Sequence, residues 1–364
     1  MKVLILSCDT GQGHNSAAHA VEEALKRRNI ACAVVDPLTF GSKKTAGTVS
    51  ATYSGMMKIT PALFGALYKA GGLYSATGLT SPVYYANAHY AQKLKDYIVA
   101  EAFTSVVCTH LFAMEAMTAI RKRLALHIPC YGVLTDYTCI PFFAETVLDG
   151  YLIPHDDLRA EMKHIPPELI HATGIPVSHR FTEHLPAQEA RLRLGLAPER
   201  PMILIMSGGV GCGNIVELCK MLLKKCGNDY QVCVLVGRNQ KLKQQVEKHF
   251  KDASCIRTVP FTDQVDLYMN AADVMISKPG GLTSTEAAVA SVPLIHLLAY
   301  AGCETKNVAF FSARGISVHA SNAKQAAIAA KHIISDPGWA ERMRAQQREY
   351  IYPDAAERVA DLVV

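Results

Sequence analysis

The 364-residue sequence lacks any apolar run that approaches the roughly 20 residues of a membrane-spanning helix. Its N-terminus also lacks the long apolar core and the small-residue cleavage site of a signal peptide. Half of the residues are apolar and only 19% are charged, which excludes a disordered or collagen-like chain. We therefore expect a cytoplasmic protein, and its length at roughly 150 residues per domain predicts two domains.

The eleven cysteines show neither a paired framework nor metal-ligand spacing, which excludes a disulfide scaffold. Five of them stand inside apolar, strand-like runs, and these are Cys8, Cys32, Cys108, Cys130 and Cys233. This placement predicts reduced, buried thiols. No DxD-type acidic cluster suited to a metal ion is evident. Asp156 and Asp157 are expected to lie in a solvated loop, so neither a metal nor another cofactor is expected.

Acidic residues are absent between Asp36 and Asp96, whereas lysines, aromatic residues and methionines are interleaved there. A stretch of this kind suits a surface that docks on anionic lipid headgroups. The alternative is a helical excursion that packs on the sheet and leaves its lysines solvated. The candidate membrane contacts are Lys58, Phe64, Tyr68, Tyr74, Tyr84 and Tyr85.

Short apolar, β-branched runs alternate with amphipathic helical stretches along nearly the whole chain, which is typical of a parallel α/β sheet. Each half opens with a buried strand, a glycine-rich turn and a helix. These elements span residues 3–6, 11–14 and 15–28 in the first half, and residues 201–206, 207–214 and 215–226 in the second. The pattern predicts an α/β protein with two Rossmann-like domains facing each other across a cleft.

Further strands are expected at residues 33–36, 105–109, 130–135, 150–153, 232–236, 274–277 and 293–296. A charged stretch before Arg200 interrupts the pattern and indicates a boundary. We predict an N-terminal domain over residues 1–180, a linker over 181–200 and a C-terminal domain over 201–340.

The first glycine turn reads TGQGH and ends at His14. Two glycines let the backbone approach a ligand, and the following helix offers unpaired N–H groups to negative charge. Ser16 stands where a dinucleotide-binding fingerprint has its third glycine, which disfavours a dehydrogenase. A histidine at a helix start is placed to act as a general base, because the helix dipole favours its neutral form. The alternative is a histidine that only caps its own turn.

The second glycine turn, Ser207–Gly213, has four glycines in seven residues and lacks the Gly-Lys-Ser/Thr ending of a P-loop. So many glycines favour a backbone nest for a diphosphate, whereas a tight turn needs only one or two. A third motif, ISKPGGLTSTEAA over residues 276–288, places Thr283 and Ser284 at a helix start, where they can hold phosphate oxygens. Glu286 lies one turn further in, either to accept hydrogen bonds from a ribose diol or as a plain helix N-terminal acid.

Six motifs occur in order along the chain: GQGH (11–14), LTDYTCIPFF (134–143), TGIPVSHRF (173–181), VGRNQKL (236–242), VPFTDQV (259–265) and SKPGGLTSTEA (277–287). Together they resemble the monogalactosyldiacylglycerol synthase and processive diacylglycerol glucosyltransferase family. Its members are inverting, two-domain glycosyltransferases of the GT-B fold, similar to the peptidoglycan N-acetylglucosaminyltransferase that makes lipid II. The resemblance extends from Val3 to about Leu362.

The resemblance implies that the C-terminal domain binds a UDP-sugar. It assigns the ribose to Glu286, and the uracil to Arg238 and the backbone of Val259 and Phe261. It assigns the diphosphate to two glycine-rich segments, with Ser207, Gly208, Gly209, Gly211, Gly280, Gly281, Thr283 and Ser284. Glu304 and Asn307 match the loop that contacts the sugar, but Cys303 replaces the usual Gln. The donor hexose, with glucose and galactose favoured, therefore stays open.

The resemblance further implies that a lipid acceptor such as diacylglycerol enters through the N-terminal domain at Gly13 of the GxGH loop. His14 would be the base, and Asp136 would orient His14 or act as the base itself. The expected partners are a UDP-sugar, the lipid acceptor and an anionic membrane surface on the cytoplasmic side, without nucleic acid. Helices in residues 341–364 would cross back to the N-terminal domain.

Two alternatives remain at this point. The first is a glycosyltransferase of the same fold with a polyprenyl-linked or soluble acceptor. The second is a non-catalytic, membrane-associated UDP-sugar sensor. His14, Asp136 and Glu286 argue against the sensor, because a protein that only binds has no evident need for His14.

Overall fold

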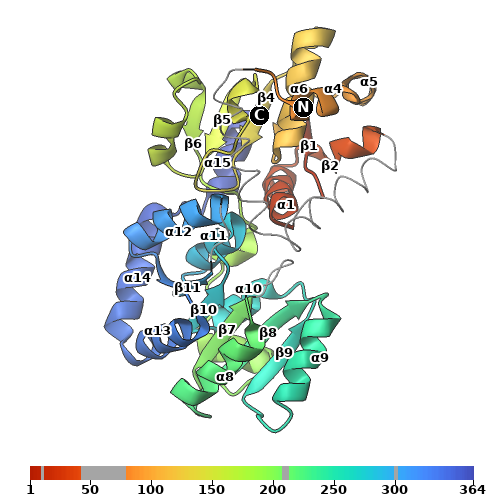
Figure 1. Cartoon of the computed structure of the whole chain (residues 1–364). Coiled ribbons are helices and arrows are strands. Elements are labelled where there is room, and N and C mark those ends of the chain that lie inside the picture. The colour runs from red at the N-terminus through yellow and green to blue at the C-terminus, as the bar shows by residue number, and fades with distance from the viewer. Residues whose placement is uncertain (10–11, 42–78, 207–212, 299–301) are drawn as a thin grey trace. The chain divides into compact units, whose positions relative to one another are not determined.

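The computed structural model describes residues 1–9, 12–41, 79–206, 213–298 and 302–364 (Figure 1). The chain divides into two compact units. Unit 1 consists mainly of Met1–His179 and Tyr352–Val364, and unit 2 of Arg180–Ala299 and Glu304–Ile351. Each unit contains a six-stranded parallel sheet with helices, which confirms the prediction of two Rossmann-like α/β domains.

The sheet of unit 1 has the strand order β2-β1-β3-β4-β5-β6. Its strands are β1 (Lys2–Leu6), β2 (Ala31–Val35), β3 (Ser105–Cys108), β4 (Cys130–Val133), β5 (Gly150–Ile153) and β6 (Ile170–Ala172). Strand β1 pairs with β2 on one side and with β3 on the other, so the order of the chain reverses between β1 and β3. In open α/β sheets, ligands bind at the carboxyl ends of the strands beside such a switch point.

Within the described residues, the helices of unit 1 are α1 (Gln12–Arg27), α4 (Pro82–Ala88), α5 (Ala91–Ala100), α6 (Leu111–Leu124) and α15 (Ala355–Val363). Short 3₁₀ turns are η1 (Pro37–Phe40), η2 (Phe143–Glu145), η3 (Asp156–Glu161) and η4 (Pro167–Leu169), and η5 (His179–Thr182) spans the boundary between the units. Asp156 and Asp157 lie exposed at the start of η3, as expected for solvated residues.

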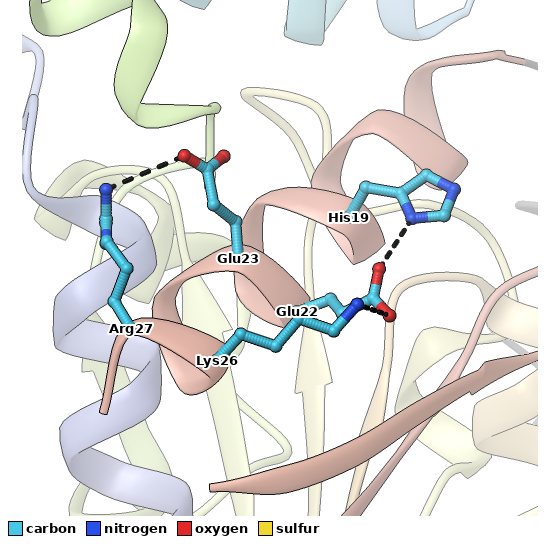
Figure 2. A pocket seen from close by; sticks show the side chains of 5 residues that line it. All are labelled: His19, Glu22, Glu23, Lys26 and Arg27. Carbon is cyan, nitrogen blue, oxygen red and sulfur yellow. Dashed lines mark hydrogen bonds and ion pairs between the residues drawn. The ribbon is translucent and has the colours of Figure 1, made fainter. Parts of the chain in front are cut away.

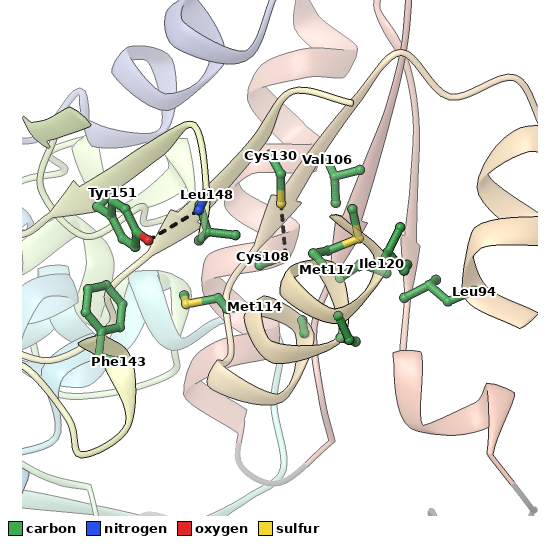
Figure 3. Packing of buried hydrophobic residues seen from close by; sticks show 14 of the residues in the cluster. Leu94, Val106, Cys108, Met114, Met117, Ile120, Cys130, Phe143, Leu148 and Tyr151 are labelled. Atoms are coloured by element: carbon green, nitrogen blue, oxygen red, sulfur yellow. Dashed lines mark hydrogen bonds between the residues drawn. The ribbon is translucent and has the colours of Figure 1, made fainter. Parts of the chain in front are cut away.

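The two faces of the unit 1 sheet bury different helices, because alternate residues of a strand point to opposite faces. Leu4 and Leu6 pack in the cluster that includes α4, α5 and α6, whereas Val3 and Ile5 pack with α1 and α15. Figure 3 shows Met114 and Met117 of α6 among the side chains of this first cluster. Burial of an apolar side chain contributes about 1.5–3 kcal/mol, so both layers stabilise this unit.

The structure confirms four of the five predicted buried thiols, and Cys32 is only half-buried. The Sγ atoms of Cys108 and Cys130 lie 3.9 Å apart within the core, and both thiols are free. Burial raises the pKa of Cys8, Cys108 and Cys233, so these groups are protonated and packed as small apolar side chains.

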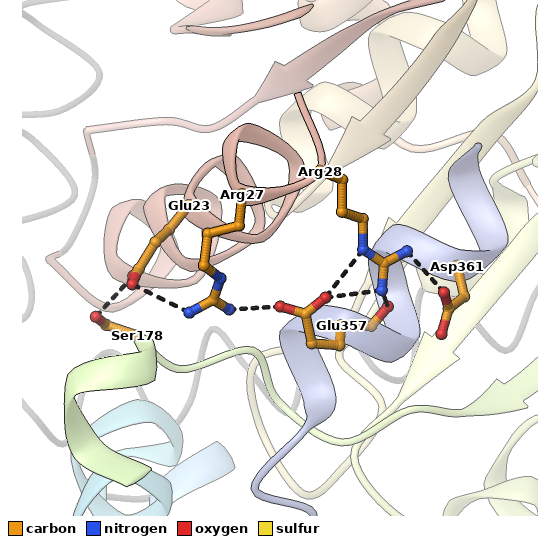
Figure 4. A network of polar contacts seen from close by, with 6 residues as sticks. All are labelled: Glu23, Arg27, Arg28, Ser178, Glu357 and Asp361. Carbon is orange, nitrogen blue, oxygen red and sulfur yellow. Dashed lines mark hydrogen bonds and ion pairs between the residues drawn. The ribbon is translucent and has the colours of Figure 1, made fainter. Parts of the chain in front are cut away.

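The C-terminal helix α15 belongs to unit 1, where it packs on α1. Arg28 Nη2 donates to Glu357 Oε2 at 2.7 Å and Arg28 Nη1 donates to Asp361 Oδ1 at 2.6 Å (Figure 4). Ser178 Oγ donates to Glu23 Oε2 of the same α1 at 2.7 Å. Gly174 adopts φ +87° beside α15, and a Cβ atom there would meet the Ala355 Cβ at 2.9 Å. The hydrogen bonds of Arg28 and Glu23 therefore attach the C-terminal helix α15 and the segment around Ser178 to α1 and the residue after it.

The sheet of unit 2 has the strand order β12-β11-β10-β7-β8-β9. Its strands are β7 (Met202–Met206), β8 (Gln231–Gly237), β9 (Ile256–Pro260), β10 (Val274–Ser277), β11 (Leu294–Leu297) and β12 (Ser317–Ala320). Strand β7 pairs with β8 and β10, so the switch point lies between β7 and β10. The third motif begins at the end of β10 and continues into α11, so it lies beside this switch point.

The helices of unit 2 are α7 (Ala187–Arg193), α8 (Ile215–Cys226), α9 (Gln240–His249), α10 (Val265–Ala271), α11 (Gly281–Val289), α12 (Cys303–Ala313), α13 (Ala323–Ser335) and α14 (Pro337–Tyr350). Asparagine side chains cap three of them: Asn214, Asn239 and Asn322 each accept an N–H from the first turn at 3.0 Å. Residues 181–200, where a linker was expected, include α7 and group with unit 2. The C-terminal residues 341–364 are divided between the units. Residues 341–351 belong to unit 2, and residues 352–364, which include α15, belong to unit 1.

Candidate active site

His14 lies in the first turn of α1, at the carboxyl edge of the unit 1 sheet. The helix begins at Gln12, three residues earlier than the sequence predicted, so Gly13 and His14 belong to the helix and not to the turn before it. Thr109 directly follows β3 and Thr135 follows β4 by two residues. All three lie near the switch point, because parallel strands end at the same edge of the sheet.

Two polar groups hold the His14 ring by one nitrogen. Nδ1 lies 2.9 Å from the Thr109 carbonyl oxygen and 3.0 Å from Thr135 Oγ1. A carbonyl oxygen only accepts hydrogen bonds, so Nδ1 carries the proton and Nε2 has a free electron pair. No described residue hydrogen-bonds to Nε2. This is the tautomer that a general base needs when it takes a proton through Nε2.

The surroundings of His14 keep its imidazole neutral. Burial lowers its pKa, and this effect exceeds the opposing influence of the Asp136 carboxylate and of the hydrogen bond to Thr109. Asp136 is half-buried and follows Thr135 at the end of β4. A histidine whose pKa lies below its usual value is unprotonated at neutral pH, ready to accept a proton.

In unit 2, the N-terminus of α11 is open to a ligand. Gly280 is the N-cap and has no side chain to satisfy the first amides of the helix, and the first intrahelical bond runs from Ser284 N–H to the Gly280 carbonyl at 3.0 Å. The amides of Gly281, Leu282 and Thr283 precede this bond, so they lack intrahelical acceptors. Backbone N–H groups at a helix N-terminus bind phosphate well, because they also carry the positive end of the helix dipole.

Glu286 lies one turn further along α11 and is half-buried. Burial raises the pKa of its carboxyl group to about 7, and the opposing charge of Arg180 offsets only part of this effect. Among the described residues, none forms a hydrogen bond or ion pair with this carboxyl group. Such a group is well suited to accept hydrogen bonds from hydroxyl groups of a ligand.

Thr283 and Ser284, the two hydroxyl residues predicted to bind the diphosphate, differ in their surroundings. Ser284 is fully buried, and its Oγ lies 2.9 Å from Nε2 of His296 on β11. A phosphate contact from this hydroxyl would first have to break that buried hydrogen bond. Thr283 is half-buried and forms no such bond, so Thr283 and the backbone amides are the more accessible donors.

Glu304 and Asn307 brace the loop that precedes α11. Asn307 Nδ2 donates to the Pro279 carbonyl at 2.9 Å, and Lys278 Nζ pairs with Glu304 Oε1 at 2.7 Å. Glu304 and Asn307 both belong to α12 and are buried, whereas Cys303 of the same helix is half-buried. They therefore hold the loop 278–280 in place. The sequence did not predict the role of Lys278 in this arrangement.

Arg238 and Phe261 come together at the ends of the adjacent strands β8 and β9. The Arg238 guanidinium lies 4.8 Å from the centre of the Phe261 ring, and 62% of Phe261 is exposed. Val259 is buried within β9. An exposed pair of a guanidinium and an aromatic ring offers a flat surface on which a planar base can stack.

The predicted membrane contacts fall into two groups. Lys58, Phe64, Tyr68 and Tyr74 lie outside the described residues, as do Ser207, Gly208, Gly209 and Gly211 of the predicted diphosphate loop. Tyr85 of α4 is 57% exposed, but Tyr84 is buried, so of these two only Tyr85 is a surface residue. A pocket of about 240 Å³ beside them is lined by Thr80, Tyr84, Tyr85, Lys122, Arg123 and Glu145.

A second hollow lies along α1, away from its first turn (Figure 2). Its lining is His19, Glu22, Glu23, Lys26 and Arg27, whose charges are largely paired with one another. Among the described residues, no group of His, Cys, Asp or Glu has a geometry that could hold a metal ion. In the same part of the chain, every helix is too short or too polar to cross a bilayer.

Sequence models of two protein families match this chain. The model of monogalactosyldiacylglycerol (MGDG) synthase matches residues 14–177 within unit 1, and that of the glycosyltransferase family 28 C-terminal domain matches residues 202–313 within unit 2. The chain is therefore similar to MGDG synthases over most of unit 1 and to family 28 glycosyltransferases over part of unit 2. This confirms the resemblance found in the six motifs.

Relatives and solved structures agree with these two domains. A processive diacylglycerol β-glucosyltransferase of Bacillus cereus is 26% identical over the whole chain and 93% of its own length, and one of Bacillus cytotoxicus is 27% identical with the same coverage. The structure of Acinetobacter baumannii MurG has a TM-score of 0.65 at 16% identity, and covers the whole of this chain and 98% of its own. The latter shows likeness of fold alone.

Sequence reasoning missed three groups that contact the His14 ring. The Thr109 carbonyl and the Thr135 hydroxyl hold His14, and the ring of His110 lies edge-on to it at 4.6 Å between ring centroids. One signal was available, because both threonines stand where predicted parallel strands end. The ring contact is visible only in the structure.

Proposed function

We propose that this chain is an inverting glycosyltransferase that transfers a hexose from a UDP-sugar to the hydroxyl group of a membrane lipid such as diacylglycerol. The two matched domains and the full-length relatives, named processive diacylglycerol β-glucosyltransferases, support this activity. The observation that carries it is the His14 ring, which is held through Nδ1, while no described residue hydrogen-bonds to Nε2.

In the proposed reaction, the acceptor hydroxyl attacks the anomeric carbon while His14 Nε2 takes its proton. The new bond joins the acceptor oxygen to the anomeric carbon, and the bond from that carbon to the UDP oxygen breaks. The electron pair of the broken bond leaves with UDP, and attack from the opposite face inverts the configuration. Asp136 would stabilise the imidazolium that forms, because its carboxylate already favours the charged form of His14.

Unit 2 would bind the donor. The negative charge that develops on the departing diphosphate suits the open amides of Gly281, Leu282 and Thr283, which can stabilise it without a metal. The Glu286 carboxyl would accept hydrogen bonds from the ribose, and the exposed pair of Arg238 and Phe261 would stack on uracil. Glucose and galactose are the proposed hexoses.

A location at the cytoplasmic face of an anionic membrane completes the proposal. The acid-free stretch between Asp36 and Asp96 contains α4, in which Tyr85 is 57% exposed, and Leu79, just before this helix, is 63% exposed. Each lysine near an anionic surface contributes on the order of 1 kcal/mol, so we expect binding to such vesicles that weakens with salt.

The decisive experiment measures UDP release from UDP-glucose, UDP-galactose and UDP-N-acetylglucosamine. Each donor is tested with anionic vesicles that contain diacylglycerol and with the same vesicles without it. Release from one donor that requires diacylglycerol supports the proposal and identifies the sugar. Release that is equal without diacylglycerol contradicts the lipid acceptor, and binding of a UDP-sugar without any release contradicts the enzymatic role.

A further inference from the structure

We propose that His110 is a positioning residue, whose buried ring covers one side of His14 and keeps that side chain a neutral, correctly oriented base. This inference rests on the proposed function, in which His14 is the base. His110 itself forms no part of the reacting groups: it would act through His14.

The contact between the two rings is close and well defined. Their centroids lie 4.6 Å apart with an interplanar angle of 84°, which is the edge-to-face arrangement that aromatic rings prefer. The His110 ring also contacts the Phe112 ring, with the centroids 4.6 Å apart and an interplanar angle of 68°. His110 is thereby packed against both Phe112 and His14, and only 7% of it is exposed.

The hydrogen bonds of His110 keep it uncharged. Its Nδ1 accepts the Phe112 N–H at 3.1 Å, as the N-cap of α6. A nitrogen that accepts a hydrogen bond carries no proton, so the neutral ring has its proton on Nε2. Protonation of Nδ1 would break this cap. Burial, together with the neighbouring His14, also lowers the pKa of His110 well below its usual value.

One short segment therefore makes two contacts with His14. Thr109 supplies the carbonyl that accepts the Nδ1 proton, and the next residue, His110, supplies the ring against the imidazole. The side chain at position 110 can adjust His14 without altering the carbonyl, because the latter belongs to the backbone at the end of β3.

The groups that act on the charge of His14 oppose each other. Asp136, at the end of β4, raises the pKa of His14, while burial lowers it. His110 is the other titratable side chain described as packed against the ring, and it is neutral. The His110 ring adds to the burial and excludes water, so its removal should let the pKa of His14 rise toward the usual value.

Two substitutions separate the ring from the cap. His110→Asn keeps an oxygen that can cap α6 but removes the ring, whereas His110→Phe keeps a ring but loses the cap. Each variant is compared with the wild-type chain by the pH profile of kcat/KM, by NMR titration of the His14 ring with ¹³C-labelled histidine, and by UDP affinity. His14→Gln identifies the His14 signal.

We expect the acid limb of the His110→Asn profile to move to higher pH. Its loss of kcat/KM should be about threefold larger near pH 6 than near pH 8, because more of His14 is protonated in acid. The NMR titration of His14 should move in the same direction, and UDP affinity should not change. His110→Phe should keep the wild-type limb and lower only the melting temperature.

The inference would be overturned if His110→Asn and the wild-type chain had the same acid limb in their pH profiles of kcat/KM and the same NMR titration of His14. The inference would also be overturned if the acid limb moved as far in His110→Phe as in His110→Asn. The loss of the N-cap of α6 would then explain the shift, because His110→Phe keeps a ring. If the NMR titration moves while the limb does not, His110 acts on His14 as inferred but His14 is not the base, and the catalytic part of the proposed function fails instead. The titration needs no activity, so the two failures are distinguishable.

Discussion

The two sheets have similar switch points, but the polar groups beside them differ in how many hydrogen-bond partners they have within the protein. In unit 1 the His14 ring already has both of its Nδ1 partners and a packed neighbour, His110. In unit 2 the Glu286 carboxyl has no described partner, and the first amides of α11 have no cap. A group that must move a proton is held ready, whereas the groups that would hold a charged, hydroxyl-rich ligand are left for that ligand to satisfy.

The physical reason lies in what each group must do. A base works best when its geometry and protonation state are set before the substrate arrives, since nothing then has to reorganise during the reaction. A ligand-binding carboxyl must instead keep its hydrogen-bonding capacity open. That openness has an energetic cost in the free protein, and the raised pKa of Glu286 reflects this cost.

The largest effect should come from removing the prepared base. We expect His14→Ala to lower kcat by at least about 100-fold, the scale of a lost general base. UDP affinity, measured by calorimetry, should stay unchanged because the donor groups belong to unit 2. A kcat equal to the wild-type value would remove His14 from the mechanism and make Asp136 the base.

The second-largest effect tests the role of the Glu286 carboxyl group in binding UDP. Glu286→Ala should weaken binding of UDP about tenfold, as expected for lost hydrogen bonds to a charged group. Ser284→Ala on the same helix is the matched control, because its hydroxyl is already bonded to His296. The control should lower the melting temperature and leave UDP affinity within about twofold. Equal affinities for Glu286→Ala and the wild-type chain would contradict the assignment of the ribose.

The pH dependence of UDP affinity sharpens the same point. A ribose hydroxyl donates best to an ionised carboxylate, and the pKa of Glu286 is raised to about 7. Binding should therefore strengthen as the pH rises through this value, by about fivefold between roughly pH 6 and pH 8. Calorimetry across this range should find the dependence greatly reduced in Glu286→Gln, whose amide does not titrate. The same slope in both proteins would assign the effect to another group.

The smallest effect concerns one of the two Nδ1 partners of His14. Thr135→Val removes the hydroxyl and keeps the shape of the side chain, while the Thr109 carbonyl still holds the ring. We expect kcat to fall about threefold, in line with the loss of a single neutral hydrogen bond. Steady-state kinetics at several pH values would measure it. A loss as large as that of His14→Ala would mean that Thr135 itself contacts the substrate.

Strands that are buried on both faces were predicted from the sequence more successfully than strands at the edges of the sheets. Strands such as β1, β3 and β7 appear in the sequence as short apolar runs, because their two faces are both covered by helices. Three strands were missed, namely β6, β9 and β12, and all three are edge strands. Their residues are partly exposed and polar, and so the runs are not continuous.

The candidate site divides in a similar way. Motifs of consecutive residues placed His14 and Glu286 at helix starts beside strand ends, since short-range patterns report local conformation. They did not separate Thr283 from Ser284, although the two differ in burial. That difference depends on His296 of β11, twelve residues further along the chain.

The two Rossmann-like domains and the types of residue at each switch point can be predicted from the amino-acid sequence alone. These features depend on local periodicity and on residues next to each other in the chain. The tertiary structure decided which nitrogen of His14 is free, which hydroxyl of α11 is committed to the core and which carboxyl is left open. Each of these depends on atoms brought together from distant strands, whose contacts no local pattern records.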